Sequence, residues 1–175
     1  ILNETNFSVN GKERIAIIGK NGGGKSTLMK ILRGECEIES GRVIRQNSIS
    51  IEMLAQSPKF NDNLSVKDAL NYELKEIFDA RDEYEKVLAK ISNEHDNPEL
   101  LHRQDELVKF IESKDGWNIE NKIERILDSF GLREYENRLV NSLSGGEIRR
   151  VALGALILKK PDVLLLDEPT NHLDV

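Results

Sequence analysis

The stretch that decides the fold is GKNGGGKST, residues 19–27, which matches the phosphate-binding pattern G-x-x-x-x-G-K-[ST]. The apolar run RIAIIG (14–19) precedes it and predicts a buried strand. The segment KSTLMKILRG (25–34) follows it and predicts a helix that ends at Gly34. A plain glycine-rich turn is the alternative, but a turn between a strand and a helix is the context in which this pattern binds the phosphates of a nucleotide. The sequence therefore predicts an α/β nucleotide-binding fold.

Each residue type in this loop has a chemical role. Glycines let successive backbone N–H groups turn toward one anion without Cβ clashes, and the start of the following helix adds partial positive charge. We expect Lys25 to reach the β- and γ-phosphates and the Ser26 hydroxyl to bind Mg²⁺. The residues of this segment predicted to bind the nucleotide are Gly19, Asn21, Gly22, Gly23, Gly24, Lys25, Ser26 and Thr27.

A second apolar run, VLLLDE (163–168), predicts a strand that ends in Asp167 and Glu168. Ligands gather at the carboxyl ends of parallel strands, so the two acids should lie near the phosphate loop. We expect Asp167 to hold Mg²⁺ through water and Glu168 to orient and polarise the attacking water. Alone, the two acids would indicate only a solvated strand end, but beside a phosphate loop they indicate hydrolysis.

The segment LSGGEIRRVALGALIL (143–158) predicts a helix that begins with a capping box between Ser144 and Glu147. Glycine at positions 145 and 146 destabilises the helix by about 1 kcal/mol per residue relative to Ala. An anion that approaches the backbone closely would explain why glycine is present there. We therefore expect Ser144, Gly145 and Gly146 to bind phosphate. One phosphate loop does not need a second such helix, so this helix should face the nucleotide of another domain. A well-started helix is the plain alternative.

Residues 65–135 have few glycines and many Glu, Lys and Leu, which predicts a helical insertion with an antiparallel hairpin arm at about 65–113 and a turn at 93–99. A first helix of about 29 residues would be about 43 Å long, so we expect the arm to project. Apolar residues recur at heptad spacing at Leu70, Leu74, Ile77, Tyr84, Leu88 and Ile91, with Arg81 in the missing place, and then at Leu100, Leu107 and Ile111, with Gln104 in a gap.

Composition narrows the class of protein. Apolar content of 38% and charged content of 32% fit a globular chain with exposed helix, and the net charge of −6 argues against binding nucleic acid through overall charge. Cys36 is the single cysteine, which excludes a disulfide framework and favours a reducing, cytoplasmic location. No apolar run approaches the roughly 20 residues of a membrane span, and the first residues lack both an initiator Met and a signal-peptide pattern, as expected of an excised piece.

The motifs GKNGGGKST, LSGGE, VLLLDEP and TNHLD, in this order, resemble those of the ATP-binding cassette (ABC) ATPases over residues 1–175. The resemblance implies a P-loop NTPase with a mainly parallel sheet, and a small antiparallel β subdomain fits the short strands predicted at 36–46 and 49–56. It also implies Mg²⁺-dependent ATP hydrolysis by paired cassettes, in which each ATP lies between the phosphate loop of one cassette and the LSGGE signature of the other. By the same resemblance, Gln56 contacts Mg²⁺ and the attacking water, and residues 170–174 touch the partner cassette.

Within that family the sequence is most similar to the ABC-F class, soluble proteins with two cassettes on one chain and no membrane domain. The NHLD motif, Glu147 and the segment 116–132 that follows the arm support this. Several members act at the ribosome, so the resemblance implies a ribosomal partner, although a solvated structural hairpin is an equal interpretation of the arm. The alternatives are the nucleotide-binding subunit of a membrane transporter and a non-hydrolysing nucleotide sensor. A switch histidine should lie beyond Val175, so we expect the isolated 175 residues to hold ATP but to hydrolyse it poorly.

Overall fold

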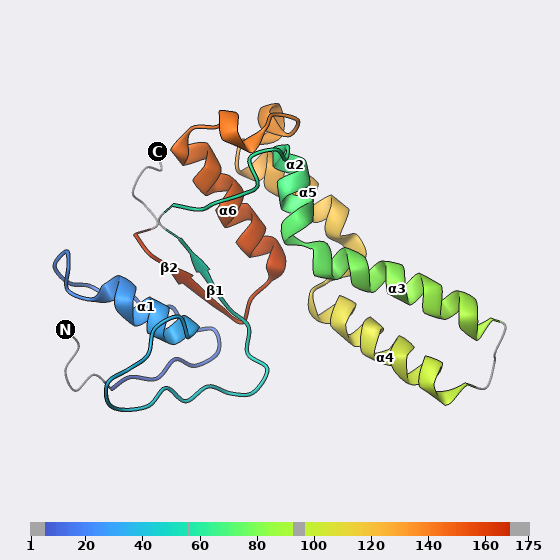
Figure 1. Cartoon of the computed structure of the whole chain (residues 1–175), viewed down its shortest axis with the longest axis horizontal. Coiled ribbons are helices and arrows are strands. Elements are labelled where there is room, and N and C mark those ends of the chain that lie inside the picture. The colour runs from blue at the N-terminus through green and yellow to red at the C-terminus, as the bar shows by residue number, and fades with distance from the viewer. Residues whose placement is uncertain (1–5, 56, 93–96, 169–175) are drawn as a thin grey trace. The chain divides into compact units, whose positions relative to one another are not determined.

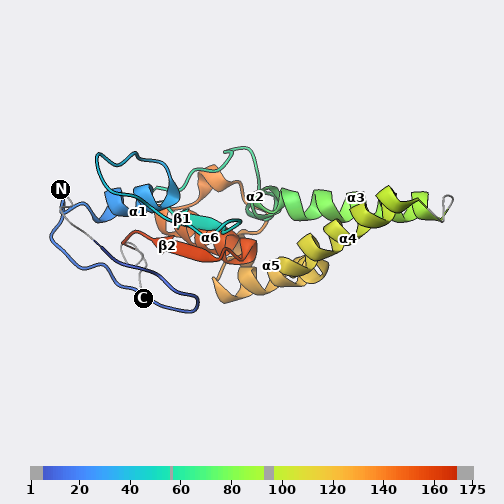
Figure 2. The same ribbon diagram turned by 90° about the horizontal axis from the view of Figure 1, so that it is seen from below.

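A computed structural model of the chain describes residues 6–55, 57–92 and 97–168. The chain divides into two compact units. The first unit comprises Ile1–Pro58 and Pro161–Val175, and the second comprises Lys59–Lys160. Figures 1 and 2 show the elements of both units from two directions.

The first unit is built on two parallel strands and a helix. Strand β1 (Ile51–Leu54) pairs in parallel with β2 (Val163–Leu166), and helix α1 (Lys25–Arg33) packs against β1. At the start of the pair, the Asp162 carboxylate accepts hydrogen bonds from the Ser50 backbone N–H at 2.8 Å and from the Ser50 hydroxyl at 2.7 Å. These bonds lie one residue before the first paired residues, Ile51 and Val163, and hold the two strands in register.

The predicted strand at 14–19 and the predicted antiparallel β subdomain are wrong. In the described ranges the only strands are β1 and β2, so residues 36–46 form none and residues 49–55 form only β1. Ile15 is 51% exposed and Ile18 is 93% exposed. An apolar run indicates a preference for burial, but a strand also requires a neighbour to accept its backbone hydrogen bonds. β1 finds that neighbour in β2, whereas residues 14–19 pair with no strand among the residues that the structure describes.

The second unit consists of helices around a main apolar core, with a second, smaller apolar cluster. Its α-helices are α2 (Val66–Glu73), α3 (Lys75–Ile91), α4 (Pro98–Ser113), α5 (Ile119–Ser129) and α6 (Gly145–Lys159), with 3-10 turns at Gly116–Asn118, Arg133–Tyr135 and Val140–Ser142. Both α2 and α5 pack against α6. The fully buried core residues are Val66, Leu70, Ile119, Leu127, Leu132 and Val151.

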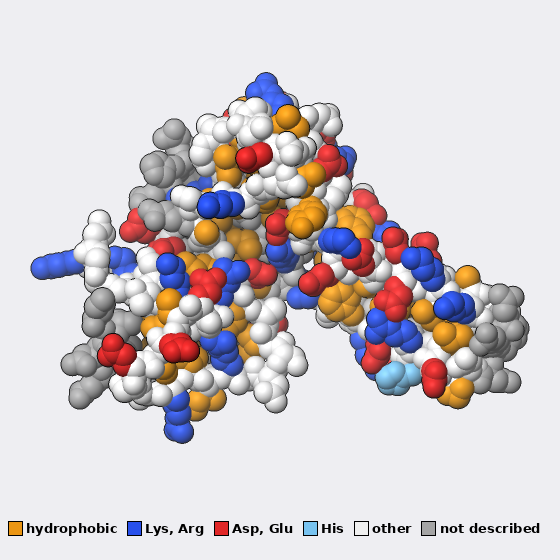
Figure 3. Space-filling model, in the orientation of Figure 1, with side chains coloured by type: hydrophobic (Ala, Val, Ile, Leu, Met, Phe, Trp, Pro, Cys, Tyr) orange, Lys and Arg blue, Asp and Glu red, His pale blue; other side chains and the backbone are white. Residues whose placement is uncertain are grey.

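Helices α3 and α4 lie side by side as the predicted hairpin arm (Figure 1). The expectation of one continuous first helix is wrong, because Leu74, with ψ 11°, ends α2 and precedes α3. Beyond the break, Ile77, Tyr84 and Ile91 keep their predicted places in the apolar stripe, but Ala80 and Val87 are buried where the heptad predicted Arg81 and Leu88. Because Ala80 is buried at this turn of the helix, Arg81 is not required to be apolar, which explains the gap in the heptad pattern. Acidic and basic side chains are interspersed over the outside of the arm (Figure 3).

Close packing fixes the arm to the core of the second unit. Trp117, which follows α4, packs edge-on against Tyr84 of α3, with ring centroids 5.1 Å apart. Arg81 of α3 donates a hydrogen bond to Glu120 of α5 at 2.6 Å. A Cβ at the buried Gly116 would lie only 2.6 Å from Ile77 Cγ2. The arm is therefore joined to the core by contacts of α3 and by the turn that follows α4.

We expect Gly116→Ala to destabilise the protein by about 1–3 kcal/mol, because the added methyl group overpacks a site walled by buried, β-branched side chains. Thermal unfolding followed by circular dichroism measures the effect. Gly145→Ala is the matched control, because a Cβ there meets nothing within 4 Å. Equal stability of Gly116→Ala and wild type would contradict the rigid junction.

Candidate nucleotide site

The glycines of the predicted phosphate loop differ in what the backbone requires of them. Gly22 and Gly24 adopt left-handed φ angles of 78° and 88°, which glycine tolerates without steric strain. Gly23 has no such angle, but a Cβ there would lie 2.9 Å from the Lys20 carbonyl oxygen. At Gly19 a Cβ would meet nothing within 4 Å, so the chain itself imposes no steric requirement there.

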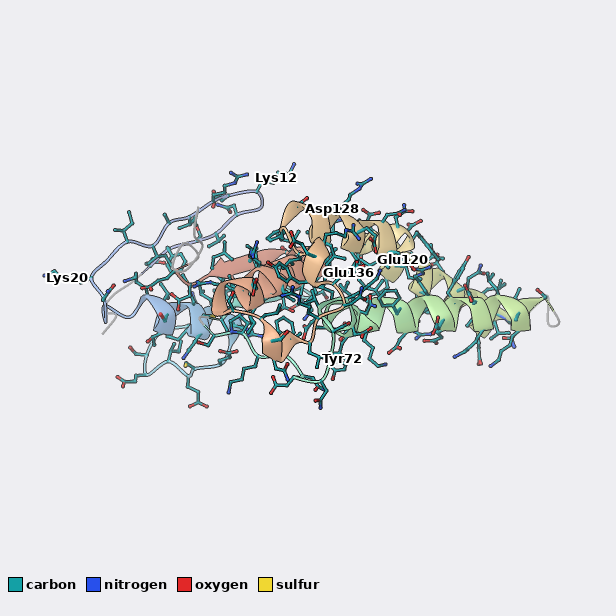
Figure 4. All side chains as sticks on the ribbon, turned by 90° about the horizontal axis from the view of Figure 1, so that it is seen from above. Lys12, Lys20, Tyr72, Glu120, Asp128 and Glu136 are labelled. Atoms are coloured by element: carbon teal, nitrogen blue, oxygen red, sulfur yellow. The ribbon has the colours of Figure 1, made fainter. Side chains whose placement is uncertain are left out.

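Lys25 closes the loop on itself. Its Nζ donates to the carbonyl oxygens of Gly19 at 2.9 Å and Lys20 at 3.0 Å, so the ammonium group lies over the loop. The Lys20 carbonyl also accepts from the Gly23 N–H at 3.0 Å. The Lys20 side chain points outward, away from the loop (Figure 4). These two bonds hold the loop together, and they also hold the Lys25 ammonium group in place over it.

The start of α1 has donors to offer to an anion. Within the described ranges, the N–H groups of Lys25, Ser26 and Thr27 make no hydrogen bond, and no side chain caps the helix. The first turn contains no acidic residue. Free N–H groups, an adjacent ammonium group and the positive end of the helix fit a phosphate chain.

The acidic pair lies at the end of β2 in the same unit. Asp167 is 8% exposed, and Glu168 is half-buried with a left-handed φ of 47°, a conformation that costs a non-glycine residue energy and is common at functional sites. In Figures 1 and 2, α1 begins and β2 ends at the same side of the first unit. The Ser26 hydroxyl and the Asp167 carboxylate are oxygen ligands of the kind that Mg²⁺ prefers. Gln56 and residues 170–174 lie outside the described residues.

The signature residues belong to the second unit, where the predicted capping box is present. The Ser144 N–H donates to Glu147 Oε2 at 2.6 Å, and the Glu147 N–H donates to Ser144 Oγ at 3.3 Å. The N–H groups of Gly145 and Gly146 make no hydrogen bond with any part of the chain that the structure describes. The capping box thus provides acceptors for the backbone N–H groups of Ser144 and Glu147. The N–H groups of the two glycines between them stay available as donors.

Glu147 is held in its charged form. Hydrogen bonds from the Ser144 backbone, from the Ser144 side chain and from the Tyr135 side chain lower the pKa of the Glu147 carboxyl below its ordinary value of 4.5, and the charge of Arg150 acts in the same direction. Burial opposes these effects but is small. The start of α6 therefore already binds one anion, the Glu147 carboxylate of its own first turn.

Sequence reasoning missed two contacts of the candidate site. Besides the Ser50–Asp162 bonds, Arg45 donates to the Ile31 carbonyl at 3.0 Å and so satisfies the end of α1. Asp162 directly before an apolar strand was a local signal for the first contact, but Arg45 and Ile31 are joined with no spacing pattern.

The fold and the site define a nucleotide-binding domain of the P-loop class. The sequence matches the family described as ABC transporter over residues 2–171. The energy-dependent translational throttle protein EttA of Haemophilus influenzae is 38% identical over 175 residues, covering 99% of this chain and 31% of that protein. The ATP-binding protein Uup of Escherichia coli K12 is 36% identical over 178 residues, covering 100% of this chain and 27% of that protein.

A solved structure is also similar. The inward-facing structure of a metal-chelate type ABC transporter has a TM-score of 0.55 and 25% sequence identity, covering 98% of this chain and 56% of that chain. This similarity confirms the predicted α/β P-loop fold. The chain belongs to the ABC transporter family of ATP-binding cassettes, and it is most like the ABC-F class. It spans a third or less of the length of the two curated relatives.

We expect Gly23→Ala to weaken ATP binding by about tenfold or more, a loss of about 1.4 kcal/mol or more. The new Cβ would push against the Lys20 carbonyl, 2.9 Å away, and so disturb the bonds that place Lys25. Calorimetric titration with ATP and Mg²⁺ measures the change. Gly11→Ala, at a position where a Cβ meets nothing within 4 Å, should bind as the wild type does. Equal affinity of the two variants would show that the loop conformation does not govern binding.

Proposed function

We propose that this cassette binds ATP with Mg²⁺ and hydrolyses it to ADP and phosphate. The observation that supports this most is the phosphate loop closed by Lys25 at the open start of α1, in the same unit as the strand that ends in Asp167 and Glu168. Membership of a family of ATP-binding cassettes supports the choice of ATP.

Each residue of the proposed site has one task. The loop N–H groups and Lys25 hold the β- and γ-phosphates, and their charge favours the negative charge that grows on the γ-phosphate during transfer. Ser26, Gln56 and Asp167 are the residues that would hold Mg²⁺, which neutralises phosphate charge when bound. Glu168 accepts hydrogen bonds from the attacking water and aligns it with the γ-phosphate.

We further propose that the signature helix completes the site of a second cassette. Its two bare N–H donors, at Gly145 and Gly146, suit the outer oxygens of a phosphate that a phosphate loop already holds. The 175 residues alone should therefore bind ATP but turn it over slowly, because hydrolysis needs donors from two cassettes.

For the whole protein we propose work in translation, at the ribosome in the cytoplasm. The support is the 38% identity with a protein named a translational throttle, together with the helical arm. In the described ranges, no helix combines the length and apolar character of a membrane span. A transporter subunit is the second candidate, favoured by the structural match to a transporter but at the lower identity of 25%. Co-sedimentation of the full-length protein with ribosomes or with membranes decides between them.

Replacing Glu168 by Gln in the full-length protein should lower kcat by about 100-fold or more while ATP affinity stays within about threefold, because the amide cannot polarise water as a carboxylate does. Lys25→Ala is the contrasting variant and should lose affinity instead. Steady-state phosphate release and equilibrium ATP binding are the two measurements. Unchanged turnover in Glu168→Gln would reject the catalytic role, and no turnover in wild type would leave a nucleotide sensor.

Gly145→Ala should separate stability from function. Ala stabilises a helix by up to about 1 kcal/mol relative to Gly, and no atom of the described residues lies within 4 Å of a Cβ at this position. The same methyl group would hold a phosphate away from the bare N–H donors, so we expect turnover by the full-length protein to fall by about tenfold or more. Thermal unfolding and phosphate release on the same sample test this. A stable variant with wild-type turnover would refute phosphate binding at Gly145.

A further inference from the structure

Helix α6 contains a glycine that neither its start nor its end requires. Gly154 is a buried residue in the interior of the helix, where glycine is destabilising relative to Ala. A Cβ at this position would lie only 2.6 Å from Ile126 Cγ2 of α5. Because that methyl group belongs to a stiff, β-branched side chain, it could not easily move aside. The glycine therefore lets the two helices approach each other closely.

A second contact joins the same two helices one turn nearer the start of α6. Arg150 Nη1 donates a partly buried hydrogen bond to the Phe130 carbonyl oxygen at 2.9 Å. Phe130 is the C-cap residue of α5, so its carbonyl has no N–H partner within that helix. The guanidinium group satisfies this carbonyl, and its charge suits the negative end of the helix dipole.

The two contacts define how the helices run. Arg150 and Gly154 are four residues apart and share one face of α6. Ile126 and Phe130 have the same spacing on α5. The later residue on α6 contacts the earlier residue on α5, which makes the two helices antiparallel. The end of α5 therefore lies beside the beginning of α6.

The end of α5 provides a fixed acceptor. The left-handed φ of 61° at Gly131 turns the chain, and the Leu132 N–H donates to the Leu127 carbonyl at 2.7 Å. A Cβ at Gly131 would lie 3.2 Å from Arg150 Nη1, so the missing side chain also leaves room for the guanidinium group. The acceptor of the Arg150 bond is thus held in place by its own turn.

Arg150 lies one turn from the glycine donors of the signature, because Gly146 precedes it by four residues on the same face of α6. We propose that Arg150 is a positioning residue for the signature: its bond to Phe130 holds the first turns of α6 against the end of α5 and so places the two glycine N–H groups. This inference rests on the proposed function. Arg150 acts through the helix and not on the nucleotide itself. Because catalysis is sensitive to misplacement by about 1 Å, a small movement of the donors would slow hydrolysis.

Arg150→Met in the full-length protein is the direct test, because it removes the guanidinium group and keeps an unbranched side chain. We expect kcat to fall by about five- to tenfold, the effect of losing one charge-assisted hydrogen bond that acts indirectly. Affinity for a fluorescent ATP analogue should stay within about twofold of wild type, because the phosphate loop belongs to the other unit. Arg125→Met is the matched control. Arg125 is exposed on α5 and makes no hydrogen bond or ion pair with the residues that the structure describes, so its loss should leave turnover unchanged.

A double-mutant cycle with Gly145→Ala separates positioning from a general loss of stability. If Arg150 acts by placing the glycine donors, its replacement should matter less once a methyl group blocks one of them. The double variant should then turn over ATP within about twofold of the slower single variant. A purely structural effect of Arg150→Met would instead add to the effect of Gly145→Ala.

Gly154→Ala perturbs the same pair of helices without changing Arg150. The added Cβ would push α6 away from Ile126, so we expect turnover to fall by about fivefold, although Ala is the better helix former. Ile126→Leu lacks the Cγ2 methyl group, and its addition to Gly154→Ala should restore most of the turnover. These variants test the proposal independently if Arg150→Met folds poorly.

Three results would overturn the inference: wild-type turnover in a folded Arg150→Met or Gly154→Ala, additive losses in the cycle, or no recovery when Ile126→Leu is added. Failure of the proposed function is distinguishable from all three. It would appear as absent hydrolysis in wild type, or as full turnover in Glu168→Gln or in Gly145→Ala, whatever the other variants do.

Discussion

The parallel pairing of β1 with β2 determines where the acidic pair lies. Asp162 and Ser50 are 112 residues apart in sequence, yet their hydrogen bonds join the chain at the start of the two strands and fix Ile51 opposite Val163. A slip of one residue would turn each side chain of β2 to the other face of the sheet, Asp167 and Glu168 with them. Because α1 packs on β1, the same pairing brings the start of α1 and the end of β2 into one unit.

Local chemistry was sufficient to predict the helix ends. Gly34 ends α1 in the left-handed conformation that glycine favours, and Ser144 and Glu147 start α6 with both bonds of the capping box. In each of these signals the interacting residues are a few positions apart, so a short stretch of sequence is enough to predict the helix end. Strands require a distant partner, which is why the apolar run at 14–19 predicted a strand that the structure lacks while β1, with β2 beside it, forms.

The arm shows how a correct pattern can give a wrong detail. The heptad stripe predicted the hairpin, and the buried Leu107 and Ile111, with Tyr84 and Ile91 packed against their cluster, confirm its facing sides. The break at Leu74 could not be predicted, because it depends on the burial of Leu74 against a core formed by helices much later in the chain.

The two helix starts assigned to phosphate are built in opposite ways. The first turn of α1 has no carboxylate, offers unpaired N–H groups and adds the Lys25 ammonium, so it can hold an anion by itself. The first turn of α6 contains Glu147, whose charge cancels much of the helix dipole, and offers only the two glycine donors. We infer that such a site does not gather free phosphate, because part of its positive potential is already used within the chain. A phosphate held at a fixed position by another part of the protein would suit the two glycine donors better. This difference between the two helix starts fits the proposal that α1 binds ATP and that α6 responds to ATP that is already bound.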